Sequence, residues 1–406
     1  MILDFPGGVA PLERTRFGKK AIKTIPSCSA ICIEALEGAT VKASAGSGVL
    51  IGSLLGYNGD MPIYSSISGV FRGIMQIDGK SYFVVMGDGE AKSSAPFPAE
   101  ENSLSEMDCE YIAERARLLS IIDSRSGRPL HELLKKANGK CSRLVIDCTE
   151  SDALSAINYR LCIEKTKSLV GGAKVLLKAT GALKCVFAAE YYRKNAFDSI
   201  LKLASDEKLF VTAELAEKYP YGDRAIMEAL YLKTLERGKT ALDEGVLIVA
   251  PETAIALYDA MLGGMPQISR YITVCGEGAK NGGNYSFPVG ITLHDVSGIC
   301  CISGDYLLIE NSLLSGTSAV GALNDSTRAL IAAKPQGRVR SACISCGKCA
   351  SACPIRLSPY DILASNSRLI VKNCILCGAC EFICPSGIPL TELIKNAKSS
   401  KEGKDE

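Results

Sequence analysis

One cysteine pattern, Cys-x-x-Cys-x-x-Cys-x-x-x-Cys-Pro, occurs twice in the last quarter of this chain, beginning at Cys343 and at Cys374. The two-residue gaps let three thiols of a run converge from a single tight loop. Gly347 and Gly378 follow the second cysteine of each run, where a residue without a Cβ lets the backbone approach a bound group closely. This region must therefore fold around eight thiols, and no other feature of the sequence constrains its structure as strongly.

The spacing of these cysteines is that of ligands to two [4Fe–4S] clusters, in which the fourth cysteine of each run binds the cluster of the other run. We expect the first cluster to take Cys343, Cys346, Cys349 and Cys384, and the second cluster to take Cys374, Cys377, Cys380 and Cys353. A structural zinc site would use only four cysteines, and a disulfide framework would require an export signal. The pattern therefore predicts a protein that transfers single electrons.

Length and charge limit the remaining possibilities. With 406 residues and 47% hydrophobic content, the chain can form several cores, and we expect roughly two to four domains. The formal net charge of +2 gives no reason to expect a nucleic-acid partner. Asp4 and Pro6 interrupt any signal peptide, and no uncharged apolar run is long enough to cross a membrane. We therefore expect a cytoplasmic protein without a transmembrane segment, able to bind peripherally at the cytoplasmic face of the membrane.

A few isolated residues carry weaker signals. Cys28 and Cys32 are candidates for a further metal or redox pair, although small buried side chains are the simpler interpretation in a reducing compartment. We expect the adjacent pair Cys300–Cys301 to alternate between the two faces of a strand. The only histidines, His131 and His294, are expected at the surface, which leaves acyl transfer without an obvious base.

The chain divides into segments of different pattern. Residues 1–90 hold short β runs punctuated by glycine, typical of a small barrel or sandwich with an N-terminal arm. Their order resembles the barrel-sandwich hybrid of lipoyl and biotinyl carriers. Ser65–Gly69 stands where the modified lysine would fall, and because it contains no lysine we expect a docking or structural module.

Residues 107–265 alternate helical patterns with apolar runs, which predicts a Rossmann-like parallel α/β domain with ligands at the carboxyl ends of its strands. The expected strands are Arg143–Cys148, Lys184–Ala189, Lys208–Thr212 and Gly245–Ala250. Strands return over residues 266–334, where we expect a small α+β module. Residues 335–396 hold the cysteine runs.

Several segments around the cysteine runs resemble the RnfC family, which comprises the peripheral subunit of Rnf ion-pumping complexes and soluble relatives such as the proline-reductase-associated electron-transfer protein. The matching segments are Phe5–Pro11, Ala43–Ile74, Asp147–Leu161, Lys218–Gly222, Ser269–Pro288 and the second cysteine run. The resemblance implies a multidomain α/β and β chain with a barrel-sandwich hybrid, a Rossmann-like domain of the flavin and NADH type, a β-grasp domain of the soluble-ligand-binding (SLBB-like) kind and a two-cluster ferredoxin-like domain.

The same resemblance makes FMN and NADH candidate ligands of the α/β domain. By this resemblance, the residues expected to line the flavin site are Glu150, Asp152, Tyr219, Pro220, Gly222 and Thr253. The family's glycine-rich loop is replaced here by Asp123–Pro129, which keeps one glycine. Arg125 and Arg128 of that segment could still clasp a phosphate through bidentate contacts. Because Asp147 and the two acidic residues at 150 and 152 disfavour a pyrophosphate, a domain that kept its fold and lost its cofactor is slightly favoured.

We therefore expect a soluble RnfC-like electron-transfer protein that relays single electrons through two [4Fe–4S] clusters to a partner reductase or membrane complex. Two alternatives stay open: an FMN-containing NADH dehydrogenase subunit and a corrinoid-binding reductase component. Arg338, Arg340 and Lys348 flank the first run, where they either steer an acidic partner or offset the charge of the cluster thiolates. The sequence does not identify the electron donor, the acceptor or the oligomeric state.

Overall fold

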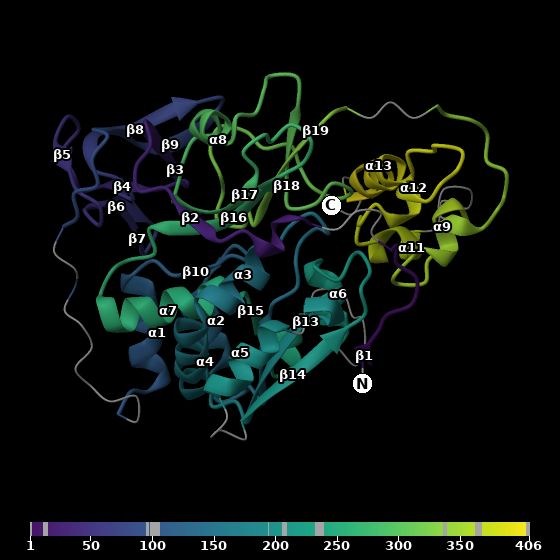
Figure 1. Cartoon of the computed structure of the whole chain (residues 1–406), viewed down its shortest axis with the longest axis horizontal. Helices are drawn as coiled ribbons and strands as arrows, with labels where there is room; N and C mark the ends of the chain where they lie inside the picture. Colours follow the sequence, from purple (N-terminus) through teal and green to yellow (C-terminus); the bar gives the residue numbers. More distant parts are fainter. Residues whose placement is uncertain are drawn as a thin grey trace.

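The computed structural model has a mixed α/β and β architecture (Figure 1). The structure describes residues 2–10, 15–94, 97, 106–193, 195–204, 209–231, 239–335, 339–361 and 368–402. Figure 1 shows the β-rich modules along one side of the molecule, the parallel sheet and its helices along the other, and the cysteine-rich region at one end.

A five-stranded sheet in which every neighbouring pair is parallel forms the centre of the α/β region. Its order is β1 (Ile2–Leu3), β14 (Phe210–Leu215), β13 (Lys184–Glu190), β12 (Arg143–Asp147) and β15 (Val246–Val249). The apolar runs predicted as strands at 143, 184 and 245 are confirmed. The start predicted at Lys208 lies outside the described residues, and β14 begins at Phe210.

The two faces of this sheet are covered by different parts of the chain. Because side chains alternate along a strand, Leu144 and Ile146 of β12 face the larger core, whereas Val145 faces the smaller one. Ile355 and Ile375, from the two cysteine runs, pack against the smaller core. The cysteine-rich region therefore lies over one face of the sheet.

Helices of the α/β region supply most of the larger core. They are α1 (Cys109–Leu118), α2 (Leu130–Ala137), α3 (Ile157–Glu164), α4 (Thr166–Thr180), α5 (Asn195–Leu203) and α7 (Pro251–Gly263). The short helix α6 (Arg224–Ala229) packs against the smaller core instead. A small ribbon of β10 (Ile122–Asp123) and β11 (Arg128–Pro129) precedes α2, at the segment that replaces the family's glycine-rich loop.

Residues 30–87 form two small antiparallel sheets. One has the order β3 (Ala30–Glu34), β9 (Lys80–Gly87), β8 (Gly69–Ile77) and β5 (Gly48–Val49), and the other has β4 (Thr40–Val41), β6 (Leu54–Asn58) and β7 (Met61–Tyr64). Phe71 and Phe83 are buried between them with ring centroids 6.4 Å apart. The turn that stands in place of a carrier lysine is buried, and Ser66 Oγ donates a hydrogen bond to the carbonyl of Val289, 2.7 Å away.

A mixed five-stranded sheet occupies residues 269–333 together with one strand from the N-terminal arm. Its order is β18 (Leu307–Glu310), β19 (Ala329–Ala333), β16 (Ser269–Cys275), β17 (Gly283–Pro288) and β2 (Ile22–Thr24). Helix α8 (Leu293–Cys300) packs on this sheet through Val296 and Cys300.

Two expectations about single residues are wrong. Cys300 and Cys301 do not alternate along a strand, because Cys300 ends α8 and Cys301 is its left-handed C-cap. His131 is only 3% exposed, and its burial lowers its pKa below the ordinary value. His294 is exposed, as expected.

The N-terminal arm contacts three parts of the molecule that are distant in sequence. β1 pairs with β14 of the parallel sheet, and β2 pairs with β17 of the mixed sheet. Between these strands, the N–H of Gly8 donates to the carbonyl of Ala352 in the first cysteine run, 2.9 Å away.

Among the described residues of the cysteine-rich region, the structure has loops and the helices α9 (Lys348–Ser351), α11 (Arg368–Asn373), α12 (Ala379–Phe382) and α13 (Leu390–Glu402). Within the described residues, no helix combines the length and apolar composition needed to cross a bilayer.

Candidate functional site

The two cysteine runs have the same backbone conformation. Left-handed residues occupy three equivalent pairs of positions, Ser345 and Leu376, Gly347 and Gly378, Arg356 and Gly387. The N–H of Ser345 donates to Cys343 Sγ at 3.4 Å, and the N–H of Leu376 donates to Cys374 Sγ at 3.4 Å. Hydrogen bonds of this kind stabilise negative charge on sulfur. The sequence repeat is therefore a structural repeat, with a backbone donor aimed at the first thiol of each run.

Four cysteines from both runs line one small apolar cavity. The lining includes Cys353 of the first run and Cys374, Cys377 and Cys380 of the second run, with Ile355, Leu357, Ile375 and Ile394 among the other residues. The structure thus brings together the four thiols that the spacing assigns to the second cluster.

The chemistry of this donor set fits an iron–sulfur cube. No three His, Cys, Asp or Glu side chains in the described ranges converge closely enough to hold a single metal ion. In a [4Fe–4S] cube each thiolate binds a different iron, so the sulfur ligands surround the cube rather than one atom. Four thiols around an apolar cavity suit the cube better than a lone cation.

Burial controls the protonation of these thiols. Removal from water, reinforced by the neighbouring cysteines, raises the pKa of Cys380 to about 12, and burial raises the pKa of Cys377 to about 12 as well. Since the thiolate is the metal ligand, these side chains stay protonated until bound iron supplies positive charge.

The thiols assigned to the first cluster lie in a much more open setting. Cys343 and Cys346 are exposed, and Cys349 and Cys384 are half-buried. Two hydrogen bonds join the segments that carry them. The N–H of Ser341 donates to the carbonyl of Ser386 at 3.0 Å, and Ser386 Oγ donates to the carbonyl of Ala342 at 2.9 Å. The segment before the first run is therefore fastened to the segment that follows Cys384.

Tyr219, predicted to line a flavin site, contacts the second cysteine run instead. Its phenol donates to the carbonyl of Cys377 at 2.5 Å, and it lies 2.9 Å from Ser315 Oγ. Tyr219 therefore connects the α/β region, the mixed sheet and the cysteine-rich region. Pro220 follows it through a cis peptide bond.

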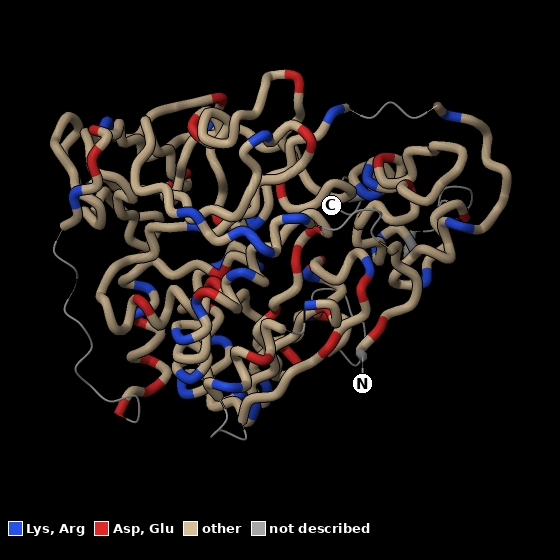
Figure 2. The backbone as a smooth tube through the Cα atoms, viewed as in Figure 1, with Lys and Arg blue, Asp and Glu red and all other residues tan. Residues whose placement is uncertain are grey.

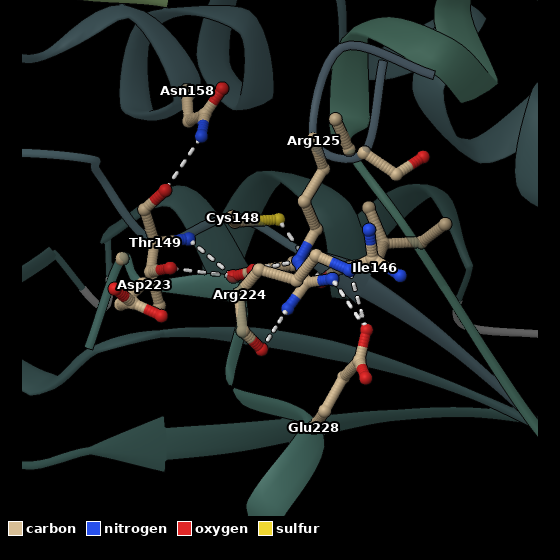
Figure 3. A network of polar contacts seen from close by, with 12 residues as sticks. Arg125, Ile146, Cys148, Thr149, Asn158, Asp223, Arg224 and Glu228 are labelled. Carbon is tan, nitrogen blue, oxygen red and sulfur yellow. Dashed lines mark hydrogen bonds and ion pairs between the residues drawn. The ribbon is translucent and has the colours of Figure 1, made fainter. Parts of the chain in front are cut away.

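A buried ion pair occupies the carboxyl end of β12, where a ligand was expected. Arg125 Nε donates to Asp147 Oδ2 at 2.7 Å, and the two side chains are 2% and 0% exposed. The guanidinium of Arg125 also donates to the carbonyl of Arg224 at 3.0 Å and lies 3.9 Å from Glu228. Figure 3 shows these three residues side by side. Arg128, its expected partner in clasping a phosphate, points to the surface and pairs with Glu132 at 3.3 Å. The two arginines do not act on one site.

Glu150 and Asp152 are also engaged within the protein. Glu150 accepts from Arg193 at 2.6 Å and from Ser155 at 2.7 Å. Asp152 accepts from the N–H of Leu313 at 2.9 Å, and burial raises its pKa above the ordinary value. Arg193 is not among the predicted site residues, because nothing in its local sequence distinguishes it from a surface arginine.

Gly222 and Thr253 lie at the same edge of the sheet. A Cβ on Gly222 would lie 1.8 Å from the carbonyl oxygen of Glu150, so only glycine allows this close approach of two loops. Thr253 Oγ1 donates to Asp123 Oδ1 at 2.7 Å. The structure therefore brings Glu150 and Gly222 together and places Thr253 beside Asp123, whereas Tyr219 lies beside the cysteines.

Arg328 is a further buried cation that the sequence did not single out. It precedes β19 and donates to the carbonyl of Gly222 at 3.2 Å, close to Asp147, Arg125 and Glu150. Its Nε and Nη1 atoms have no hydrogen-bond partner among the described residues, and burial lowers its pKa.

The arginines expected to hold a phosphate are thus committed to carboxylates. In this arrangement Arg125 and Arg128 are not available to the phosphate of an FMN, whereas Arg328 keeps two donors unsatisfied among the described residues. The cysteine cavity, by contrast, fits its expected group.

Two family models match this chain. Residues 124–259 match the Nuo51 FMN-binding domain, and residues 337–385 match the 4Fe-4S dicluster domain. The second match contains all eight cysteines of the two runs.

Curated relatives extend the similarity to most of the chain. The C subunit of the Na⁺-translocating ferredoxin:NAD⁺ oxidoreductase complex of Acetobacterium woodii is 24% identical over 396 residues, covering 90% of this chain and 87% of the relative. The C subunit of the proton-translocating ferredoxin:NAD⁺ oxidoreductase complex of Clostridium ljungdahlii is 25% identical over 250 residues, covering 57% and 52%. The chain spans about half the length of several further relatives of the same kind. These matches confirm the predicted resemblance to the RnfC family.

Among solved structures, an H₂-reduced NAD⁺-reducing [NiFe]-hydrogenase aligns with 76% of this chain and 57% of that chain, at 16% identity and a TM-score of 0.47. Agreement at this level supports no conclusion about function.

Proposed function

We propose that this chain is an electron-transfer component that relays single electrons through two [4Fe–4S] clusters. The first cluster is assigned to Cys343, Cys346, Cys349 and Cys384, and the second cluster to Cys374, Cys377, Cys380 and Cys353. The observation that carries the proposal is the apolar cavity in which Cys353 lies beside three cysteines of the other run. The match of this region to a dicluster domain supports the same assignment.

The clusters, when bound, supply one-electron redox chemistry. The chain's own residues hold them in two different environments. The cavity lining excludes water from the second site, and Tyr219 together with the N-terminal arm fixes that site against the α/β region. The first site is left open to a partner.

We also propose the module boundaries that the sequence predicts. Residues 1–90 form a barrel-sandwich hybrid with an N-terminal arm, residues 107–265 a Rossmann-like domain, residues 266–334 an SLBB-like β-grasp domain and residues 335–396 a ferredoxin-like domain. The separate sheets and cores of these segments support this division. The partner would be a redox complex, as the names of the relatives from Acetobacterium woodii and Clostridium ljungdahlii suggest.

Cofactor analysis tests this function. Anaerobically purified chain should contain about eight iron atoms and eight sulfides, with electron paramagnetic resonance signals of [4Fe–4S] clusters after reduction. Material without iron or labile sulfide would remove the proposal.

A second candidate function, an FMN-containing NADH dehydrogenase subunit, is favoured by the match to the Nuo51 FMN-binding domain and by the unsatisfied donors of Arg328. Stoichiometric FMN that is bleached by NADH would support it over the simple relay. No feature of the described residues favours the corrinoid-binding alternative.

A further inference from the structure

The second cluster site is the more enclosed of the two. Its four thiols line an apolar cavity, whereas the thiols assigned to the first cluster are exposed or half-buried. Each electron that a [4Fe–4S] cluster accepts adds a negative charge, which apolar surroundings stabilise less than water does. Enclosure by itself would therefore make the second cluster harder to reduce than the first.

One lysine of α13 brings a positive charge to the edge of this enclosed site. The half-buried ammonium of Lys398 donates to the carbonyl of Cys374 and, at 3.4 Å, to the carbonyl of Lys372. It also lies close enough to the thiol of Cys374 to interact with the charge on that sulfur. A positive charge in this place stabilises the reduced, more negative state of a bound cluster.

Packing holds α13 in the position that this contact requires. Ile394, one helical turn before Lys398, is 1% exposed and lines the cavity of the second site. Ala397 packs in the same small core, together with Cys374. Figure 1 shows α13 beside α12, and Figure 2 shows Lys or Arg positions along α13. The helix therefore fixes the backbone of Lys398 beside the second site.

The first run has no equivalent of this charge. Lys398 lies as far along the chain from Cys374 as Ser367, an uncharged residue outside the described part of the chain, lies from Cys343. Lys348 does belong to the first run, but its side chain is exposed, so water and salt screen its charge. The two halves of the repeat thus share a backbone conformation and differ in this charge.

We propose that Lys398 raises the reduction potential of the second cluster by holding a positive charge beside Cys374. This inference rests on the proposed relay and concerns the balance between its two clusters. In the relay step one cluster loses an electron and the other gains it, and no proton or bond is transferred. Because Lys398 opposes the effect of enclosure, it brings the two potentials closer together, so that the electron can pass in either direction.

The competing explanation is that backbone donors alone oppose the effect of enclosure. The N–H of Leu357 donates to Cys353 Sγ at 3.2 Å, in addition to the contact between Leu376 and Cys374 described above. A substitution at Lys398 keeps both of these donors. Only the proposed role of the lysine therefore predicts a change of potential when its charge is removed.

The test is a redox titration of the full chain with both clusters, followed by electron paramagnetic resonance under anaerobic conditions. Lys398→Met removes the charge and keeps an unbranched side chain, whereas Lys398→Arg keeps the charge. Lys395→Met is the matched control, because it makes the same substitution at an exposed position of the same helix. Iron and sulfide are measured in every variant.

We expect Lys398→Met to lower one of the two reduction potentials. At a fixed solution potential, the ratio of reduced to oxidised second cluster should fall roughly tenfold, which corresponds to about 59 mV for one electron. The same ratio should stay within about twofold of wild type in Lys398→Arg and in Lys395→Met, since the first keeps the charge and the second changes a screened one. The potential of the other cluster and the iron content should not change.

Two unchanged potentials in Lys398→Met with iron intact would overturn the inference, and so would equal shifts in Lys398→Met and Lys395→Met. Loss of about half of the iron in Lys398→Met but not in Lys398→Arg would also overturn it, because the ammonium would then hold the cluster rather than set its potential. Lys398→Gln provides the same comparison if the methionine variant does not fold. These outcomes leave the relay standing, whereas a wild-type chain without iron would remove the relay itself.

Discussion

The phenol of Tyr219 donates a hydrogen bond to the main-chain carbonyl of Cys377, 2.5 Å away. The side chain comes from the turn that follows β14, and the acceptor belongs to a cysteine assigned to the second cluster. Burial and this contact hold the α/β region and the second cysteine run together. Val9 and Ala379 are buried in the same small cluster of side chains, so the junction is apolar as well as hydrogen-bonded.

Alanine substitutions at Gly378 and Gly347 should distinguish the free-energy cost of disturbing this junction from the cost of local backbone strain. Gly378 and Gly347 have nearly the same left-handed conformation, with φ of 78° and 71°, so an alanine costs about 1–2 kcal/mol at either position. Only at Gly378 does the added Cβ meet another segment, the carbonyl of Leu314. We expect Gly378→Ala to lower the free energy of unfolding by about 1–3 kcal/mol more than Gly347→Ala, measured by anaerobic urea denaturation. Equal losses would mean that the segment around Leu314 shifts to accommodate the added Cβ without lowering the free energy of unfolding.

The crossed assignment of the cysteines predicts a specific pattern of iron loss. Cys353→Ala should remove about half of the iron, because one of two clusters loses a ligand. Adding Cys374→Ala should remove little more, since both cysteines are assigned to the second cluster. Adding Cys343→Ala to Cys353→Ala should instead remove most of the rest.

Iron and sulfide analysis of anaerobically purified variants measures this pattern. Cys301→Ala is the matched control, because Cys301 is exposed and lies outside the two runs. If the pair Cys343 and Cys353 behaved as one unit, the clusters would not be crossed.

Removal of one partner of the buried ion pair at the end of β12 should cause a large loss of stability. Arg125→Ala leaves the carboxylate of Asp147 buried without its cation, which should cost about 3–5 kcal/mol. Arg128→Ala removes the neighbouring surface pair with Glu132 and should cost less than about 1 kcal/mol. Chemical denaturation of both variants measures the difference. Similar, small losses would show that water reaches Asp147, and the edge would then have room for a ligand.

Glu190 predicts a dependence of stability on pH. Burial raises its pKa from 4.5 to about 7, with Arg193 opposing the shift. Between pH 4.5 and about 7, the folded state therefore holds a proton that the unfolded state has already released. For this reason the contribution of Glu190 to the free energy of unfolding falls as pH rises through that range and stays low above it. Glu190→Gln should remove this dependence while keeping an acceptor for the N–H of Glu150.

The measurement is the free energy of unfolding of both proteins at about pH 5 and pH 8. We expect the free energy of unfolding of Glu190→Gln, relative to that of wild type, to increase as pH rises. Glu132→Gln, at an exposed position, controls for the change of charge. A difference that is the same at both pH values would place the pKa of Glu190 near its ordinary value.

The sequence predicted those features that depend on local pattern. The segments that begin at 143, 184 and 245 are continuous apolar runs, the pattern of parallel strands, because both faces of their sheet are covered. The two-residue gaps of the cysteine spacing let the thiols of one run converge, and the four cysteines that the spacing assigns to the second cluster line one cavity. In α8, Thr292 is the N-cap and its Oγ1 accepts a hydrogen bond from the N–H of Asp295, so Cys300 and Cys301 end a helix where alternation along a strand was expected.

Contacts between distant segments could not be predicted in the same way. The turn at Tyr219 matches a flavin-domain motif, but its phenol is placed by Ser315 and Cys377, which lie far along the chain. Arg125 was expected to hold a phosphate because it lies in the segment that replaces the family's glycine-rich loop and its guanidinium can make bidentate contacts. Its ion pair depends on Asp147, and only the folded sheet brings the two together.

The N-terminal arm has a consequence for how the protein is made. Its partners are residues 214–215, 284–286 and 352, so the arm cannot reach its final place until the ribosome has synthesised most of the chain. Residues translated early therefore complete their contacts late, because the last of their partners, Ala352, lies in the final part of the chain.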